Sequence, residues 1–227
     1  MKALVCAILL VPATLHAQTL PGSRDLDDTK LRPGTWDVTM TVQRGEQTMA
    51  VGTARYELVE LPGGQWAYIT SVTTQLGTAT DTSIARQRTL EPVRHRSHAV
   101  PRTLSLDYEG RHVTGSHVPT EGPAREIDRT TEVPTFDAAM LDLVLGSLPL
   151  ATGYTTRLPL YIEEQEGLAW FEVEVVGETE VGSEAAWQVQ VTAPTLTMVY
   201  RIGRTGRQFL GARIEYPTGA VMEVTRN

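Results

Sequence analysis

The stretch GTWDVTMTVQ, residues 34–43, sets a repeat of two residues that much of the chain keeps. Its apolar side chains Trp36, Val38 and Met40 alternate with polar ones, which is the pattern of a β-strand with one dry face. Arg44-Gly45-Glu46 follows as a hairpin turn, because glycine reaches positive φ without strain. The stretch therefore predicts a strand and a hairpin of an antiparallel sheet.

The same alternation returns along the chain and is clearest near the C-terminus, in residues 171–175, 187–191, 196–202 and 210–216. Short strands joined by tight glycine turns indicate a consecutive antiparallel meander. A sheet of about ten or more strands cannot stay flat, because strand twist accumulates and the edges must be closed or covered. We therefore expect an all-β fold: a curled antiparallel meander that forms a β-roll, half-barrel or barrel.

One segment breaks the repeat of two. Residues 135–148 carry apolar side chains at helical spacing, Thr135 or Asp137 can cap the N-terminus, and Gly146 with Pro149 ends the run. This predicts one short helix at about 137–147, packed on the concave side of the sheet. No linker separates the strands on either side of it, so residues 34–227 are expected to form a single antiparallel β domain.

The first 17 residues have the layout of a secretory signal peptide. Lys2 gives a positive start, residues 3–15 are almost wholly apolar, and Ala17 ends a small-residue cleavage site. No later apolar run approaches the roughly 18–20 residues that a membrane helix needs, so no transmembrane segment is expected in the mature chain. We expect export to the periplasm or cell envelope, solubility after cleavage, and a flexible lead-in at residues 18–33.

Charge and cysteine content exclude several classes of protein. The chain has 27 acidic and 20 basic side chains and a net charge of −7, which argues against a nucleic-acid partner because phosphates require a basic face. The only cysteine, Cys6, lies in the predicted signal peptide, so the mature chain forms no disulfide. There is no phosphate loop, dinucleotide fingerprint or nucleophile elbow. We expect no cofactor and favour a non-enzymatic function.

Two polar clusters fit the wet face of a sheet better than a chemical site. His95 and His98 are three residues apart, which on a strand points them to opposite faces, and no nearby ligand completes a metal-binding spacing. We expect solvated strand histidines and no metal. Glu172 and Glu174 alternate with apolar residues, so they indicate the wet side of a strand rather than a catalytic carboxylate pair.

The C-terminal half resembles a known family. The segments that carry the resemblance are Asp137–Leu148, Leu148–Leu150, Gly153–Tyr154, Val181–Gly182, Trp187–Val189, Met198–Ile202, Ala212–Glu215 and Val221–Val224. Their order is similar to a family of exported bacterial proteins known only as a domain of unknown function, whose members look like rolled antiparallel sheets in the cell envelope. More loosely, the architecture is similar to periplasmic lipoprotein carriers, whose half-open barrels hold acyl chains under a helix. The resemblance implies a fold and a location but no catalytic residues.

The leading hypothesis is an envelope protein that binds an apolar or amphiphilic, lipid-like ligand or an envelope protein partner. A tightly filled roll has a solid core, whereas an unfilled one has a greasy cavity that suits an acyl chain; the sequence leaves both open. Arg94 and Arg96 share a strand face and fit either a headgroup or a solvated outer face. The predicted ligand-binding residues are Trp36, Met40, Trp66, Met198 and Tyr200 on strands, Met140, Leu141 and Val144 on the helix, and Arg94 and Arg96 at the headgroup.

Two alternatives come from other classes of function. One is an envelope scaffold or interaction module with a solid core, which pairs an exposed strand edge with another protein. The other is a hydrolase whose site is assembled from distant strands and has no recognised motif.

Overall fold

The computed structural model describes residues 17–227, so all but the last residue of the predicted signal peptide lies outside the described residues. The strands form one 15-stranded sheet in the order β8-β7-β6-β5-β4-β3-β2-β1-β15-β14-β13-β12-β11-β10-β9. Neighbouring strands are antiparallel except β9 and β10, which are parallel. The sheet curls without closing, because β8 and β9 are its two ends and do not pair with each other. The predicted fold class, a curled antiparallel meander with one short helix, is confirmed.

The sheet has two walls that meet where the last strand returns to the first. The first wall is β1 (Gly34–Arg44), β2 (Gln47–Leu61), β3 (Gln65–Thr74), β4 (Gly77–Arg86), β5 (Pro92–Ala99), β6 (Arg102–Glu109), β7 (His112–Pro119) and β8 (Arg125–Thr130). The second wall is β10 (Thr155–Ile162), β11 (Gly167–Val181), β12 (Glu184–Thr192), β13 (Thr197–Gly203), β14 (Phe209–Glu215) and β15 (Val221–Arg226). Strand β1 pairs with β15, with Met40 opposite Val224.

Bulges and a close-packed glycine help the sheet to curl. The register of paired strands shifts between Met40 and Thr41 in β1 and between Arg201 and Ile202 in β13. Such bulges bend a strand and increase its twist. Gly115 in β7 lies so close to the backbone carbonyl of Ser105 that a Cβ atom there would overlap it. These features allow the two walls to curve around a common interior.

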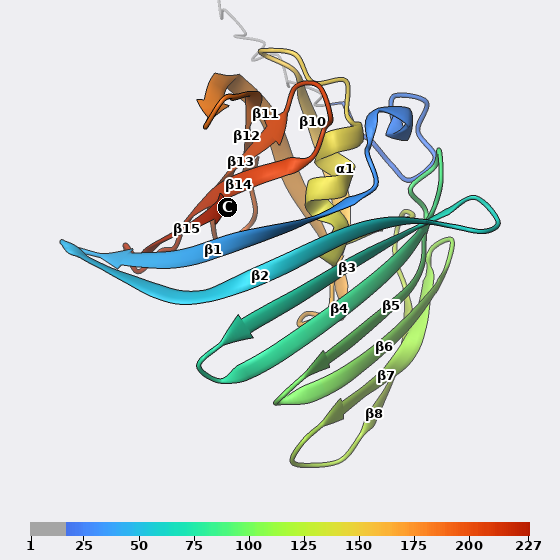
Figure 1. Ribbon diagram of the computed structural model, residues 1–227. Helices are drawn as coiled ribbons and strands as arrows, with labels where there is room; N and C mark the ends of the chain where they lie inside the picture. Colours follow the sequence, from blue (N-terminus) through green and yellow to red (C-terminus); the bar gives the residue numbers. More distant parts are fainter. Residues whose placement is uncertain (1–16) are drawn as a thin grey trace, which may run out of the picture.

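The helical segment occupies part of that interior. It begins with β9 (Phe136–Asp137) and the 3-10 turn η2 (Ala138–Met140), and continues as α1 (Leu141–Ser147), a helix whose residues are all buried. The side chain of Asp137 accepts a hydrogen bond of 3.1 Å from the Ala139 N–H. Of the two caps that the sequence offered, Asp137 rather than Thr135 therefore caps the first turn. Figure 1 shows α1 on the concave side of the curled sheet, between the two walls. Within residues 17–227, no helix has the length and apolar character needed to cross a membrane.

The segment before β1 packs against the first wall. The 3-10 turn η1 (Asp28–Lys30) lies in it, and Asp28 is buried there. Its Oδ2 accepts hydrogen bonds from the Trp66 indole N–H at 2.8 Å and from the Arg88 backbone N–H at 2.7 Å. These two bonds tie η1 to β3 and to the turn after β4, whereas residues 17–19 pair with Arg157 of β10.

Candidate functional site

A cavity of about 240 Å³ lies between the helical segment and the sheet. It brings together both walls of the roll, because β2, β3 and β4 line it on one side and β13, β14 and β15 on the other. The residues that line it are Tyr56, Thr70, Asp81, Ala138, Ala139, Leu141, Asp142, Tyr200, Phe209, Ala212, Ile214 and Val224. The interior of the roll is therefore not completely filled by side chains.

Aromatic rings form one side of this cavity. Tyr56 lies with its ring centre 5.5 Å from that of Phe209, and Phe209 lies 6.0 Å from Tyr200. Behind them, Trp36 stacks on Tyr56 at 5.9 Å and Tyr68 lies 6.0 Å from Tyr56. We call these five residues the aromatic cluster; their spacing is that of rings in favourable contact, so they form a rigid apolar wall.

A buried carboxylate, Asp142, stands against the aromatic cluster. It is the second residue of α1, and its Oδ2 accepts a hydrogen bond from the Tyr68 O–H. Its Oδ1 accepts a 3.0 Å hydrogen bond from the Leu143 backbone N–H. Burial raises the pKa of Asp142 to about 6, although the hydrogen bonds from Tyr68 and Leu143 favour the charged form. The carboxylate is thus held in the interior mainly by neutral donors.

The tyrosines near Asp142 stay neutral over the physiological pH range. Burial, together with the negative charge of Asp142, raises the pKa of Tyr56, Tyr68 and Tyr200 above the usual value for a phenol. The hydroxyl of Tyr200 donates only a weak hydrogen bond, 3.5 Å long, to the sulfur of Met198. Its O–H is therefore held by a partner that a ligand atom can readily replace.

The structure brings four of the predicted ligand-binding residues to the cavity or directly behind it. Leu141 and Tyr200 line the cavity. Trp36 lies in the aromatic cluster, and Met198 contacts the Tyr200 hydroxyl.

The other predicted residues lie elsewhere. Met40, Met140 and Val144 are buried in the main core without lining the cavity, and Trp66 anchors the segment before β1. Arg94 and Arg96 lie on the opposite face of β5 from the buried His95. Both donate to Asp107, each through a bond of 2.9 Å.

Sequence reasoning missed the buried carboxylate of the cavity, Asp142. Asp142 is the only charged residue in the run from Ala138 to Pro149, which is otherwise apolar or small. A lone carboxylate on a helix with no wet face must be buried, and buried ionisable groups mark functional sites more often than solvated ones. That signal was present in the sequence. The cavity-lining Tyr56 and Phe209 carried no such signal, because aromatic residues on strands are usual core residues.

A second polar group lies where the two ends of the curled sheet approach each other. Asp137 in β9 accepts a 2.6 Å hydrogen bond from the Ser83 hydroxyl and lies 3.0 Å from Nδ1 of His95. Beyond β10, Glu163 accepts a 2.5 Å hydrogen bond from Arg102. Glu166 likewise pairs with two arginines of β8, Arg125 and Arg129. We call these eight residues the polar seam; they are Ser83, His95, Arg102, Arg125, Arg129, Asp137, Glu163 and Glu166.

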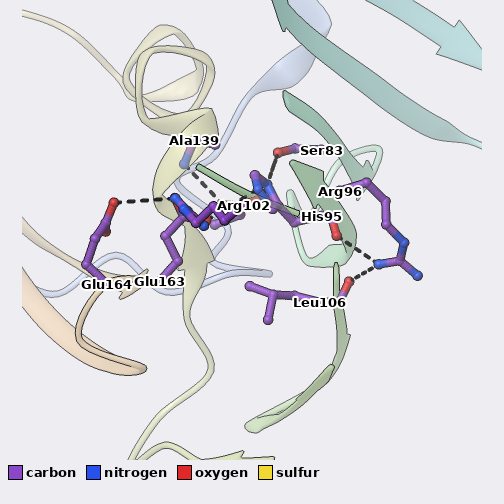
Figure 2. A network of polar contacts seen from close by, with 9 residues as sticks. Ser83, His95, Arg96, Arg102, Leu106, Ala139, Glu163 and Glu164 are labelled. Carbon is purple, nitrogen blue, oxygen red and sulfur yellow. Dashed lines mark hydrogen bonds and ion pairs between the residues drawn. The ribbon is translucent and has the colours of Figure 1, made fainter. Parts of the chain in front are cut away.

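Figure 2 shows how the seam is arranged. Ser83 and His95 point toward each other, while Arg102 reaches to Glu163 and Glu164. Arg96 extends away from this group and donates to the Leu106 carbonyl oxygen at 2.6 Å. The seam thus joins the first wall to the strands around β10 through side chains, in a place where no backbone ladder forms. Within the described residues, no group of three histidine, cysteine or acidic side chains gathers closely enough to hold a metal ion.

The serine, histidine and aspartate of the seam do not form a nucleophilic triad. Ser83 Oγ and Asp137 Oδ2 both lie 3.0 Å from the same ring nitrogen, Nδ1 of His95. A triad needs the serine and the carboxylate on opposite ring nitrogens. Ser83 is also 1% exposed, so a substrate carbonyl has no access to it.

One of the two histidines on β5 is not solvated as the sequence predicted. The side chain of His95 lies on the inner face of β5, where it contacts Asp137. His98 lies on the other face and is exposed.

The seam leads to a prediction about pH. Burial lowers the pKa of His95, but its hydrogen bond to Asp137 and the charges of Asp137 and Glu163 raise it more, so the net shift is upward. Because folding raises the pKa of His95, protonated His95 stabilises the folded state. This stabilisation is complete below about pH 6.5, the pKa of histidine in the unfolded chain, and is lost as the pH rises through the pKa of His95 in the folded state. We expect His95→Gln to lower the free energy of unfolding more at pH 6 than at pH 9.

Urea unfolding of the wild-type and variant proteins at both pH values measures this difference. His98→Gln, a change of the exposed histidine on the same strand, is the matched control and is expected to show no such pH dependence. A His95→Gln cost that is constant with pH, or that grows as the pH rises, contradicts the assignment of a protonated His95 to the seam.

Known proteins were compared with this chain in sequence and in structure. A model of the family described as "Protein of unknown function (DUF3108)" matches residues 33–220. No curated protein matches the chain. Among solved structures, the chain is similar to the crystal structure of a DUF1329 family protein from Desulfovibrio piger. That likeness has 10% sequence identity and a TM-score of 0.30, over 85% of this chain and 82% of that chain. The predicted resemblance to a family known only as a domain of unknown function is confirmed.

Proposed function

We propose that this chain, which belongs to the family described as Protein of unknown function (DUF3108), is an exported envelope protein that binds a lipid-like amphiphile in the cavity beside α1. The single observation that carries the proposal is the cavity itself, which both walls of the roll and the helical segment line together. Its lining is mixed: apolar side chains gather on β14 and β15, and polar atoms gather at Asp142, Asp81 and Thr70.

A mixed lining of this kind suits a molecule with one apolar and one polar end. Ligand pockets are typically apolar and contain a few polar groups that fix the orientation of the ligand. Here Phe209, Ala212 and Ile214 offer the apolar surface, and Asp142 offers the polar anchor. The cavity is somewhat smaller than the range of about 300–1,000 Å³ that drug-sized ligands occupy. We therefore expect a slender ligand, such as one aliphatic chain with a small head, rather than a bulky lipid.

The sheet edge supports ligand binding over the scaffold alternative. A scaffold that pairs its edge with another protein needs an uncovered and uncharged edge strand. The end strand β8 instead carries Arg125, Glu126, Asp128 and Arg129. Charged side chains on an edge strand oppose edge-to-edge pairing. The predicted signal peptide at residues 1–17 supports export, and an exported protein would meet its ligand outside the cytoplasm.

Blocking the cavity tests the proposal. Ala139 is exposed and lines the cavity. We therefore expect the indole of Ala139→Trp to fill the cavity without disturbing the packing of the core. We expect this variant to bind dodecanol at least about tenfold more weakly than the wild type, as measured by isothermal titration calorimetry below the solubility limit of the alcohol. Organic extraction of the purified wild-type protein, followed by mass spectrometry, is expected to yield a co-purifying amphiphile.

Ala185→Trp is the matched control, because Ala185 is an exposed alanine on β12 that does not line the cavity. It is expected to bind dodecanol as the wild type does. Equal binding by Ala139→Trp and Ala185→Trp removes the cavity as the binding site, and no binding by the wild type removes the proposed function.

A further inference from the structure

We propose that the cavity selects amphiphiles with a cationic head, such as a long-chain primary amine, and that Asp142 is the counter-ion of that head. This inference rests on the proposed function and names the chemical class of its ligand. It follows from three features of the described residues: the charge of the cavity lining, the incomplete pairing of Asp142, and the aromatic rings beside it.

The lining of the cavity has a single sign of charge. Among its residues, Asp81 and Asp142 are acidic and none is basic. The two arginines predicted as headgroup contacts, Arg94 and Arg96, lie on the other face of β5 and are paired with Asp107. An anionic head in the cavity would meet two carboxylates and no cation, which like-charge repulsion disfavours. A cationic head would instead be attracted by the two carboxylates.

Asp142 has bonding capacity that the protein leaves unused. An ionised carboxylate offers about four acceptor positions, and the hydrogen bonds from Tyr68 and Leu143 occupy only two of them. Within residues 17–227, no arginine, lysine or histidine lies within ion-pair distance of Asp142. Arg32 and Arg207 line a small void that Asp142 also lines, but Arg32 donates to backbone carbonyls of Thr29 and Leu31 instead.

Arg207 makes no ion pair with Asp142 within the described residues either, and its Nε and Nη1 have no hydrogen-bond partner there. Burial lowers the pKa of Arg207, and the charge of Asp27 acts in the opposite direction. Buried charges in proteins are normally paired, because an unpaired one loses its hydration without compensation. An ammonium group delivered by a ligand supplies the missing partner of Asp142 and can donate to its free acceptor positions.

The aromatic cluster adds a second attraction for a cation. Tyr56, Tyr200 and Phe209 line the same cavity as Asp142, and the faces of their rings carry negative potential. Carboxylate and aromatic faces together are the surroundings that proteins use for ammonium groups. The remaining apolar wall, on Ile214 and Val224, is left for the aliphatic part of the ligand.

A set of three ligands with the same chain tests the inference. Dodecylamine, dodecanol and dodecanoate differ only in the charge of the head, and their affinities are measured by titration calorimetry at pH 7.5, below the concentrations at which they form micelles. For the wild type we expect the amine to bind at least about tenfold more tightly than the alcohol, and the carboxylate to bind most weakly. In Asp142→Asn, the amine is expected to bind no more tightly than the alcohol.

Asp107→Asn is the control, because it removes a carboxylate from the convex face, and it is expected to keep the wild-type order of affinities.

The pH dependence of binding is a second readout and needs no variant. As the pH falls from 7.5 to 5, Asp142 becomes protonated, so the affinity for the amine is expected to fall while that for the alcohol stays constant. Asp81 is the other titratable acid of the lining, and Tyr56, Tyr68 and Tyr200 stay neutral throughout.

The outcomes separate this inference from the proposed function. Tight binding of the alcohol without preference for the amine overturns the inference and leaves the proposed function standing. A preference for the amine that persists in Asp142→Asn and at pH 5 also overturns it. If none of the three ligands binds the wild type, the proposed function fails and the inference fails with it.

Discussion

Asp142→Asn is expected to raise the free energy of unfolding by about 3 kcal/mol at neutral pH. The reason is that burial raises the pKa of Asp142 to about 6 from its ordinary value of 3.8. A carboxyl group whose pKa is raised by folding binds its proton more tightly in the folded state. The fold therefore loses stability as the pH rises from about 4 to about 6, and the loss persists above that range. Asparagine has nearly the same shape but carries no charge, so the variant avoids the loss.

Urea unfolding of the wild type and Asp142→Asn at pH 7.5 and pH 4 measures the effect. The variant is expected to be more stable at pH 7.5, and most of the difference is expected to disappear at pH 4. Asp107→Asn is the control. Burial raises the pKa of Asp107, but hydrogen bonds from Arg94 and Arg96 lower it more, so that variant is not expected to gain stability. An Asp142→Asn protein that is less stable than the wild type at pH 7.5 contradicts this account of the buried carboxylate.

The predicted gain has a functional meaning. Stabilising substitutions commonly reduce function where a site is strained or carries an unpaired group. If Asp142 is retained as the anchor of a ligand, the change that stabilises the empty protein is the same change that removes its preference for an amine. Stability and selectivity should therefore move in opposite directions in this one variant.

Leu145→Ala is expected to lower the free energy of unfolding by about 3 kcal/mol, within the range of about 2–5 kcal/mol for large core residues changed to alanine. Leu145 lies in α1 and is 0% exposed. Its side chain belongs to the main core, which contains residues of both walls, so its removal leaves a cavity that neither wall can readily fill. The loss is measured by urea unfolding at neutral pH.

The control for this prediction is Leu76→Ala. Leu76 lies in the turn between β3 and β4 and is 86% exposed, so its change to alanine is expected to alter the stability little. Equal losses in the two variants contradict the view that α1 is the centre around which the two walls pack.

The fold was predictable from the sequence because the alternation of apolar and polar residues along a strand indicates which side chains are buried. Trp36, Val38 and Met40 were predicted to share a dry face, and all three are buried on β1. The helical spacing of apolar residues after Asp137 likewise predicted the position of the helix, although its first turn is 3-10 and α1 begins only at Leu141. Both signals are local, so they survive without knowledge of the tertiary structure.

The site was less predictable because it depends on contacts between distant residues. Arg102 and Glu163 lie 61 residues apart, and nothing in the charge pattern around either residue indicates that they meet. Arg94 and Arg96 were candidates for a headgroup site, but the strand direction that buries His95 points them outward. Whether the roll contained a cavity depended on the combined volumes of residues from both walls, which periodicity does not report.

The central claim is that an amphiphile binds between α1 and the two walls of the roll, and site mapping with a photoreactive ligand tests it most directly. A long-chain aliphatic alcohol that carries a diazirine is irradiated with the purified protein, and the labelled positions are found by proteolysis and mass spectrometry. We predict labels in residues 138–142 and 209–214, which excess dodecanol removes. Labels confined to the convex face around Arg94 and Arg96, or labelling that excess dodecanol does not reduce, would contradict the claim.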